Sequence, residues 1–143
     1  MMSLPQEKLE EIRQECMKLA REHGAYFSTD YSKISKMAAK LHTSGEVYLV
    51  HDASLTGSGD QGWAVTSDGI FTCEKTFGMF GTPFLTRWER FKDSAFTEFF
   101  AGWFKYDDSK IAYACVSNKS AEADMLCFFD RITSIACNYY SWL

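Results

Sequence analysis

The first part of the chain repeats its apolar residues at the spacing of an α-helix. Residues 4–23 place apolar side chains on one side of the predicted helix and mostly charged side chains on the other. The apolar positions are Leu9, Ile12, Cys16, Leu19 and Ala20. Ser3 and Gln6 have the spacing of a capping box that would begin this helix, and Gly24 would end it.

A second, shorter helix is predicted over residues 30–42, with Thr29 or Asp30 as its N-cap. Its apolar stripe consists of Tyr31, Ile34, Ala38 and Leu41. Two short amphipathic helices cannot bury such stripes alone, so both are expected to pack on the rest of the chain.

From Gly45 onward the apolar period changes from that of a helix to the alternation of β-strands. The predicted strands are 47–51, 62–66, 70–74, 84–91, 96–105 and 110–116. The strongest local signal is Asp68-Gly69, because an Asp-Gly pair between two alternating runs is typical of a hairpin turn. A second hairpin is expected to turn over residues 106–109.

The helical period returns near the end of the chain, where residues 120–141 predict a long amphipathic helix with Ser120 as its N-cap. Its apolar face comprises Met125, Phe128, Phe129, Ile132, Ile135, Ala136 and Tyr139. A face this wide needs a sheet to cover. We therefore expect an α+β fold in one domain, 1–143, made of a helical extension, 1–44, and a curved sheet with its closing helix, 45–143.

The loop and strands from His51 to Phe71 read His-Asp-Ala-Ser-Leu-Thr-Gly-Ser-Gly-Asp-Gln-Gly-Trp-Ala-Val-Thr-Ser-Asp-Gly-Ile-Phe. This segment resembles a pattern in bacterial pleckstrin-homology-like (PH-like) domains, and the run from Thr86 to Phe91, Thr-Arg-Trp-Glu-Arg-Phe, is similar to their Trp-centred fourth strand. The resemblance covers roughly residues 45–140 in the order of elements. It implies a bent antiparallel sheet or partly open barrel whose open end is closed by the last helix. It also implies a domain that binds a ligand or partner without catalysis.

Charge and cysteine usage exclude several classes of function. The net charge of −4 disfavours general binding to nucleic acid, and loop 54–61 has no Lys or Arg, so strong membrane or phosphoinositide binding is not expected. Five cysteines without a CxxC motif indicate reduced thiols and a cytoplasmic protein. We see neither a signal peptide nor an apolar run of the ~18 residues that a membrane span needs.

Candidate catalytic and metal-binding residues are few. His23 and His42 fall at predicted helix ends, and His51 and Asp52 point to opposite faces of a strand, which disfavours a dyad. The histidines and cysteines lack the spacing of a zinc site, and Cys73 and Cys115 are expected to be buried in strands. The glycine loop 56–60 lacks the Gly-Lys-Ser/Thr of a phosphate-binding loop. We therefore expect no enzyme activity and no cofactor or metal.

Aromatic residues in three segments are the candidate contact residues. Segment 76–84 has no charge, so its apolar residues either complete the core or dock a partner. Within 99–104, an unbroken strand would place Phe100 and Phe104 on one face and Phe99 and Trp103 on the other, so either the N-terminal helices or a partner covers the outer face. Trp142 lies off the apolar stripe of the last helix.

The sequence thus favours a non-enzymatic protein-binding module. Its candidate anchors are Phe77, Met79, Phe80, Trp103 and Trp142. A second copy of the chain is as good a partner as a different protein. Two alternatives stay open: a small acidic inhibitor or immunity-type protein that neutralises a basic partner, and a small-molecule carrier with a cavity in the barrel.

Overall fold

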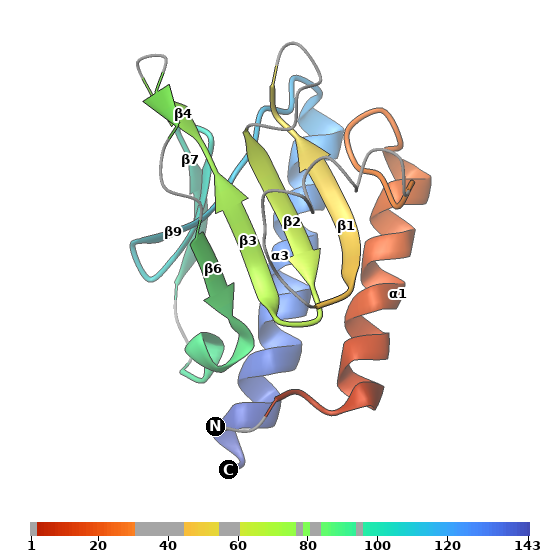
Figure 1. Cartoon of the computed structure of the whole chain (residues 1–143), viewed down its shortest axis with the longest axis vertical. Helices are drawn as coiled ribbons and strands as arrows, with labels where there is room; N and C mark the ends of the chain where they lie inside the picture. Colours follow the sequence, from red (N-terminus) through yellow and green to blue (C-terminus); the bar gives the residue numbers. More distant parts are fainter. Residues whose placement is uncertain (1–2, 31–44, 55–60, 77–78, 81–83, 94–95) are drawn as a thin grey trace.

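A computed structural model of the chain describes residues 3–30, 45–54, 61–76, 79–80, 84–93 and 96–143 (Figure 1). Within this part of the chain there are two α-helices, one 3-10 helix (η1) and nine strands. In chain order they are α1 (Gln6–Glu22), β1 (Val47–Asp52), β2 (Gly62–Thr66), β3 (Gly69–Cys73), β4 (Lys75–Thr76), β5 (Met79–Phe80), β6 (Phe84–Arg87), η1 (Trp88–Phe91), β7 (Thr97–Phe100), β8 (Trp103–Tyr106), β9 (Ser109–Tyr113) and α3 (Lys119–Ser141).

Helix α1 confirms the first predicted helix and its buried face. Its buried residues are Leu9, Ile12, Cys16 and Leu19. The predicted capping box is wrong, because Pro5 is the N-cap and no side chain caps the helix. The predicted helix 30–42 lies, but for Asp30, outside the described residues.

Strands β1, β2, β3 and β6 form an antiparallel sheet in that order, which confirms the hairpin predicted at Asp68-Gly69. The Thr66 hydroxyl accepts the N–H groups of Asp68 and Gly69 at 3.1 and 3.2 Å, which closes the turn. Gly69 has a φ of +150°, and a Cβ there would lie 2.0 Å from the Thr86 carbonyl oxygen of β6. The turn therefore requires glycine because the next strand passes so close.

The predicted fourth strand, 84–91, is only half correct. Strand β6 ends at Arg87 and the chain then forms η1. Trp88 and Phe91 are both buried, and a strand would have sent side chains three residues apart to opposite faces. The 3-10 helix aligns positions i and i+3, so both rings reach the core, and Trp88 Nε1 donates to the Ser67 carbonyl at 3.2 Å.

The predicted strand 96–105 is interrupted by a reversal of the chain. Ala101 and Gly102 have positive φ values of 54° and 84° and form a two-residue turn, so Phe100 pairs with Trp103 across it. The face assignment made for a continuous strand is therefore wrong. Phe99 and Phe104 pair and face the core, whereas Phe100 and Trp103 share the opposite face. The second predicted turn, between Tyr106 and Ser109, is confirmed.

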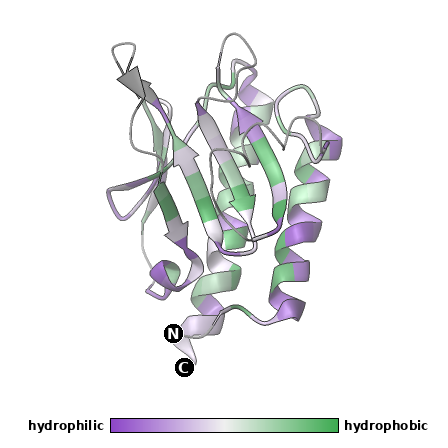
Figure 2. Ribbon diagram, viewed as in Figure 1, coloured by the Kyte–Doolittle hydropathy of each residue, from purple (hydrophilic) through white to green (hydrophobic). Residues whose placement is uncertain are grey.

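Helix α3 lies behind the four-stranded sheet, and α1 lies beside α3 at the β1 edge of the sheet (Figure 1). The outward side of α1 is polar and its inward side apolar (Figure 2). Helix α3 confirms the predicted closing helix, although its N-cap is Asn118, whose Oδ1 accepts the Ala121 N–H at 2.9 Å, and not Ser120. The wide apolar face of α3 packs against the β-strands.

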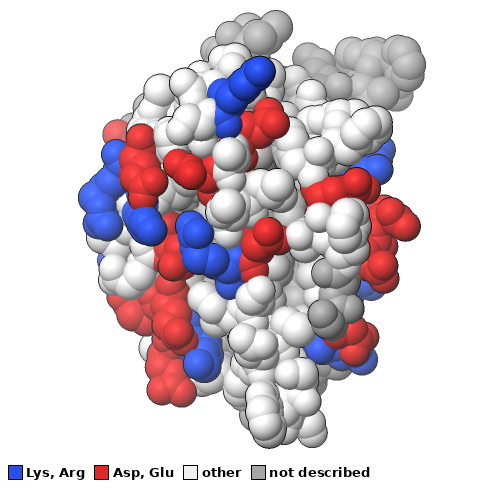
Figure 3. All heavy atoms as spheres, turned by 180° about the vertical axis from the view of Figure 1, so that it is seen from behind, with Lys and Arg blue, Asp and Glu red and all other residues white. Residues whose placement is uncertain are grey.

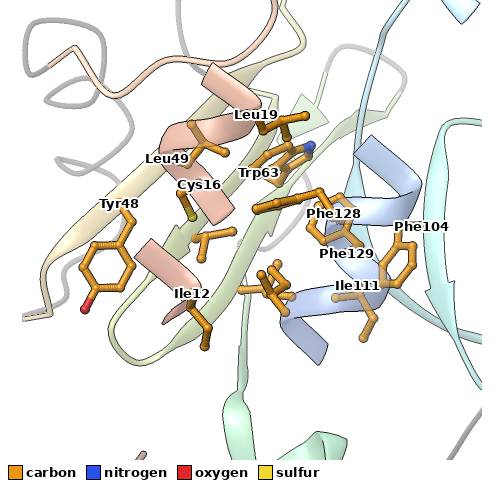
Figure 4. Packing of buried hydrophobic residues seen from close by; sticks show 14 of the residues in the cluster. Ile12, Cys16, Leu19, Tyr48, Leu49, Trp63, Phe104, Ile111, Phe128 and Phe129 are labelled. Atoms are coloured by element: carbon orange, nitrogen blue, oxygen red, sulfur yellow. The ribbon is translucent and has the colours of Figure 1, made fainter. Parts of the chain in front are cut away.

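The core centres on Trp63 of β2, which is fully buried among rings from several elements (Figure 4). Phe128 and Phe129 of α3 lie 6.0 and 4.9 Å from it, between ring centroids, and Phe27 stacks at 5.6 Å. Phe104 of β8, in the sheet formed by β7, β8 and β9, stacks on Phe129 with a centroid distance of 4.6 Å. One aromatic cluster thereby joins both sheets to α3 and to the segment after α1.

Strands β7, β8 and β9 form a second antiparallel sheet, which side chains connect to the first. The Thr72 hydroxyl of β3 accepts the Tyr113 N–H at 2.9 Å and donates to the Gly62 carbonyl at 2.8 Å. His51 of β1 accepts the Cys115 N–H at 3.0 Å. These bonds hold the end of β9 across one end of the four-stranded sheet.

Candidate interaction surface

His51, the candidate catalytic histidine, is fully engaged in the structure. Its Nε2 accepts the backbone N–H of Cys115 at 3.0 Å, which fixes the ring proton on Nδ1, and Nδ1 then donates to the Tyr26 carbonyl at 2.8 Å. Burial lowers the pKa of His51 below its ordinary value of 6.5, against the opposing effects of the Tyr26 carbonyl and Asp52. The ring is a neutral structural clip that joins three segments of the chain.

His23 closes α1, as predicted, and reaches across to α3. Its Nε2 lies 2.7 Å from Asp124 Oδ2, a hydrogen bond that ties the end of α1 to α3. Glu22 brings a third donor atom within 4.8 Å, so these residues are a possible ligand set for a metal ion. The His23–Asp124 pair already accounts for two of the three donors, and Glu22 is exposed.

The cysteines are free thiols in different environments. Cys16 and Cys73 are buried, and burial raises the pKa of Cys16 far above its ordinary value. Cys115 is exposed, which contradicts the expectation that it would be buried in a strand. Strand β9 ends at Tyr113, so Cys115 lies beyond the sheet.

The predicted anchor residues do not gather at one place. Phe77 lies outside the described residues, as do the side chains of Met79 and Phe80, whose backbone forms strand β5. Trp103 is only 7% exposed, whereas Trp142, directly after α3, is 89% exposed. Trp103 therefore offers a partner little area of its own.

The outer face of the β7–β9 sheet carries a cluster that the sequence did not reveal. We call Phe100, Trp103, Lys105, Lys110 and Tyr113 the aromatic–lysine surface. Phe100 is 64% exposed at the end of the β7–β8 hairpin. Its ladder partner Trp103 is in turn the cross-strand partner of Tyr113, and the ring centroids of Trp103 and Tyr113 lie 5.2 Å apart in an edge-to-face contact.

Each lysine of the aromatic–lysine surface lies over a ring. Lys105 Nζ is 5.5 Å from the centroid of Phe100, and Lys110 Nζ is 5.1 Å from the centroid of Trp103. These cation–π contacts hold both ammonium groups above the sheet. The lysine that covers Trp103, together with Tyr113, explains why the indole is buried on an outer face.

A cleft of about 400 Å³ lies between η1 and the β8–β9 hairpin. Its apolar part comprises Phe91 and Ile111, both buried, and charged residues of both signs line the remainder. Phe91 and Tyr106 meet edge-to-face at 4.9 Å, and the Tyr106 hydroxyl donates to the Asp93 carbonyl. The cleft is open to solvent and large enough for a small ligand.

Comparisons with protein families, with curated proteins and with solved structures give no match for this chain. The class that the fold defines is an α+β protein with a four-stranded and a three-stranded antiparallel sheet and a closing C-terminal helix. No helix in the described part of the chain has the length and apolar character needed to cross a bilayer.

Proposed function

We propose that the protein is a non-enzymatic protein-binding module that contacts its partner through the aromatic–lysine surface. The observation that carries this proposal is the exposed ring of Phe100, whose cross-strand partner Trp103 packs edge-to-face on Tyr113. Aromatic rings on exposed surfaces supply large contact areas, and such residues contribute much of the energy of protein interfaces.

The hairpin that presents Phe100 is firmly held. The Ala114 N–H donates to the Gly102 carbonyl at 2.8 Å, so the β7–β8 turn is bonded to the end of β9. A Cβ on Gly102 would lie 3.1 Å from the Tyr113 ring, so the turn also packs closely on the surface. A preformed contact residue loses little conformational entropy when it binds, which favours affinity.

The absence of chemistry in this proposal rests on His51. Both of its ring nitrogens form hydrogen bonds with the backbone, and burial keeps the ring neutral, so it has no free nitrogen with which to serve a nucleophile. An inhibitor of a basic partner would need a concentrated acidic surface. On the face seen in Figure 3, acidic and basic side chains are interspersed, which does not favour that alternative.

The test is a quantitative pull-down from the source cell with Phe100→Ser, after circular dichroism shows that the variant is folded. The matched control is Trp142→Ser, which removes an even more exposed ring directly after α3. We expect Phe100→Ser to reduce capture of the specific partners about tenfold, as for loss of a contact hot spot, and Trp142→Ser to leave it unchanged. The reverse pattern would move the contact site to the C-terminal ring and reject the aromatic–lysine surface.

A small-molecule carrier is a second candidate, and the cleft beside η1 is the observation that favours it. Its volume of about 400 Å³ falls in the range of ligand pockets. A thermal-shift screen over metabolites should then find compounds that raise the melting temperature of the wild type. Ser109→Trp would place an indole at an exposed position that lines the cleft and should abolish the shift; a shift that persists in a folded Ser109→Trp protein would place the ligand elsewhere.

A further inference from the structure

Two lysines of the aromatic–lysine surface face each other directly. Lys105 of β8 and Lys110 of β9 are cross-strand partners in the ladder. Like charges at directly opposed positions destabilise a sheet. Neither lysine forms an ion pair with any residue that the structure describes, although the chain has 19 acidic residues against 15 Lys and Arg.

The acids closest in the ladder do not neutralise this pair. Glu98 of β7 is the cross-strand partner of Lys105, and Asp107 and Asp108 form the turn between the two lysine strands. None of these carboxylates comes within ion-pair distance of either ammonium. The two ammonium groups instead rest on rings, which leaves their outward sides available to an anion.

From this arrangement, and resting on the proposed function, we infer that the partner presents an acidic protein segment to this surface. Carboxylates of the segment bind Lys105 and Lys110, and an apolar side chain beside them packs on Phe100. A carboxylate between the two ammonium groups forms ion pairs with them and also screens their mutual repulsion. Both effects stabilise the bound state.

Charge decides between an acidic protein segment and a nucleic acid. A nucleic acid carries a regular row of phosphates, and its affinity grows with the number of cations that contact them. The surface offers two lysines on a protein whose net charge is −4, so an extended polyanion would meet repulsion beyond the pair. A short acidic segment places its charge at the pair alone.

The first experiment titrates the full-length, isotope-labelled protein with a synthetic peptide in which two glutamates flank a tryptophan on each side. Amide resonances of β7, β8 and β9 should shift, and added salt should weaken the binding. Two further probes are the same peptide with glutamine in place of glutamate and an oligothymidine of equal charge. Equal binding of the glutamine peptide, tighter binding of the oligothymidine, or no shift with the acidic peptide would overturn the inference.

The second experiment uses the double variant Lys105→Gln/Lys110→Gln, with Lys18→Gln/Lys119→Gln as control. Lys18 and Lys119 are exposed and lie on the helices, so both variants change the net charge equally. We expect the first to weaken binding of the acidic peptide about tenfold, because two charge contacts are lost, and the control to change it less than twofold.

The same variants in the pull-down separate this inference from the proposed function. Loss of the cellular partner with Phe100→Ser but not with Lys105→Gln/Lys110→Gln would reject the acidic segment and keep the interaction surface. Loss of the partner with Phe100→Ser and also with Lys105→Gln/Lys110→Gln supports both the interaction surface and the acidic segment. Retention of the partner with both folded variants would reject the surface itself.

Discussion

Single residues in this protein owe their roles to where the fold places them. The sequence pattern places His51 near the end of β1, where a polar residue is common. In the structure His51 is buried, and both of its ring nitrogens form hydrogen bonds. Trp63 is likewise buried, and its Nε1 has no hydrogen-bond partner among the described residues, so its ring packing must outweigh that loss. Each of these residues is a structural junction.

We predict that His51 makes the free energy of unfolding depend on pH. Its folded-state pKa is below 6.5, so at pH values beneath 6.5 the unfolded chain binds a proton that the folded chain excludes. Stability from this residue is complete above 6.5 and decreases as the pH falls, by at most about 1.4 kcal/mol per pH unit. Urea unfolding of wild type and His51→Gln at about pH 7.5 and 5.5 measures this. The glutamine side chain can form both hydrogen bonds but does not titrate, so the free energy of unfolding of His51→Gln should depend less on pH. An equal change with pH in wild type and variant would contradict the prediction.

Phe129 should be among the most sensitive core positions, because its ring contacts both Trp63 and Phe104. We expect Phe129→Ala to lower the free energy of unfolding by about 3–5 kcal/mol, from lost apolar burial and the cavity that remains. Phe96→Ala is the matched control, since Phe96 is 70% exposed, and should change it by less than about 0.5 kcal/mol. Denaturant unfolding that ranks the two variants equally would refute the described core.

At the scale of elements, local signals explain where most helices and strands lie but not how they begin and end. Helix α3 begins one residue before the predicted start, because Asn118 accepts the Ala121 N–H and Ser120 lies inside the helix. The strand predicted over 96–105 breaks at Ala101-Gly102, and alanine with a positive φ is rare enough that the pattern gave no warning.

We expect the cap of α3 to distinguish these two starts of the helix. Asn118→Ala removes the capping acceptor and should lower the free energy of unfolding by about 0.5–2 kcal/mol. Ser120→Ala replaces an exposed serine within the first turn by a better helix former and should be neutral or slightly stabilising. Thermal unfolding of the two variants is the measurement, and a larger effect at Ser120 would restore the sequence-based cap.

At the scale of the molecule, the two sheets are joined by one aromatic cluster and by side-chain hydrogen bonds. Thr72 and His51, on β3 and β1, bind backbone groups near the end of β9. This connection sets the orientation of the β7–β9 sheet and therefore of the aromatic–lysine surface.

Thr72→Val should loosen this junction. The substitution keeps the side-chain shape but leaves the Tyr113 N–H and the Gly62 carbonyl without their partner, so we expect a loss of about 1–3 kcal/mol in the free energy of unfolding. Thr86→Val is the control, because Thr86 is also buried and no hydrogen bond of its hydroxyl is seen among the described residues. Hydrogen exchange should show faster opening of β9 in Thr72→Val alone; equal exchange in both would contradict the proposed junction.

The aromatic–lysine surface could be predicted only in part. Segment 99–104 stood out as rich in aromatic residues, but a continuous strand put Phe100 on the same face as Phe104. The reversal at Gly102 changes that face, and the Lys105–Lys110 pairing depends on the bulge in β9, where the register shifts. Neither feature has a clear local signal, so neither lysine was selected from the sequence.

The sequence by itself determined the places and buried faces of α1 and α3 and the Asp68-Gly69 hairpin, because periodicity and turn preferences act over a few residues. Only the tertiary structure decided that His51 is a clip, that Trp103 is buried beneath Lys110 and that Phe100 faces outward. These outcomes depend on contacts between residues distant in the chain, and no local pattern encodes which strands will meet or in what register.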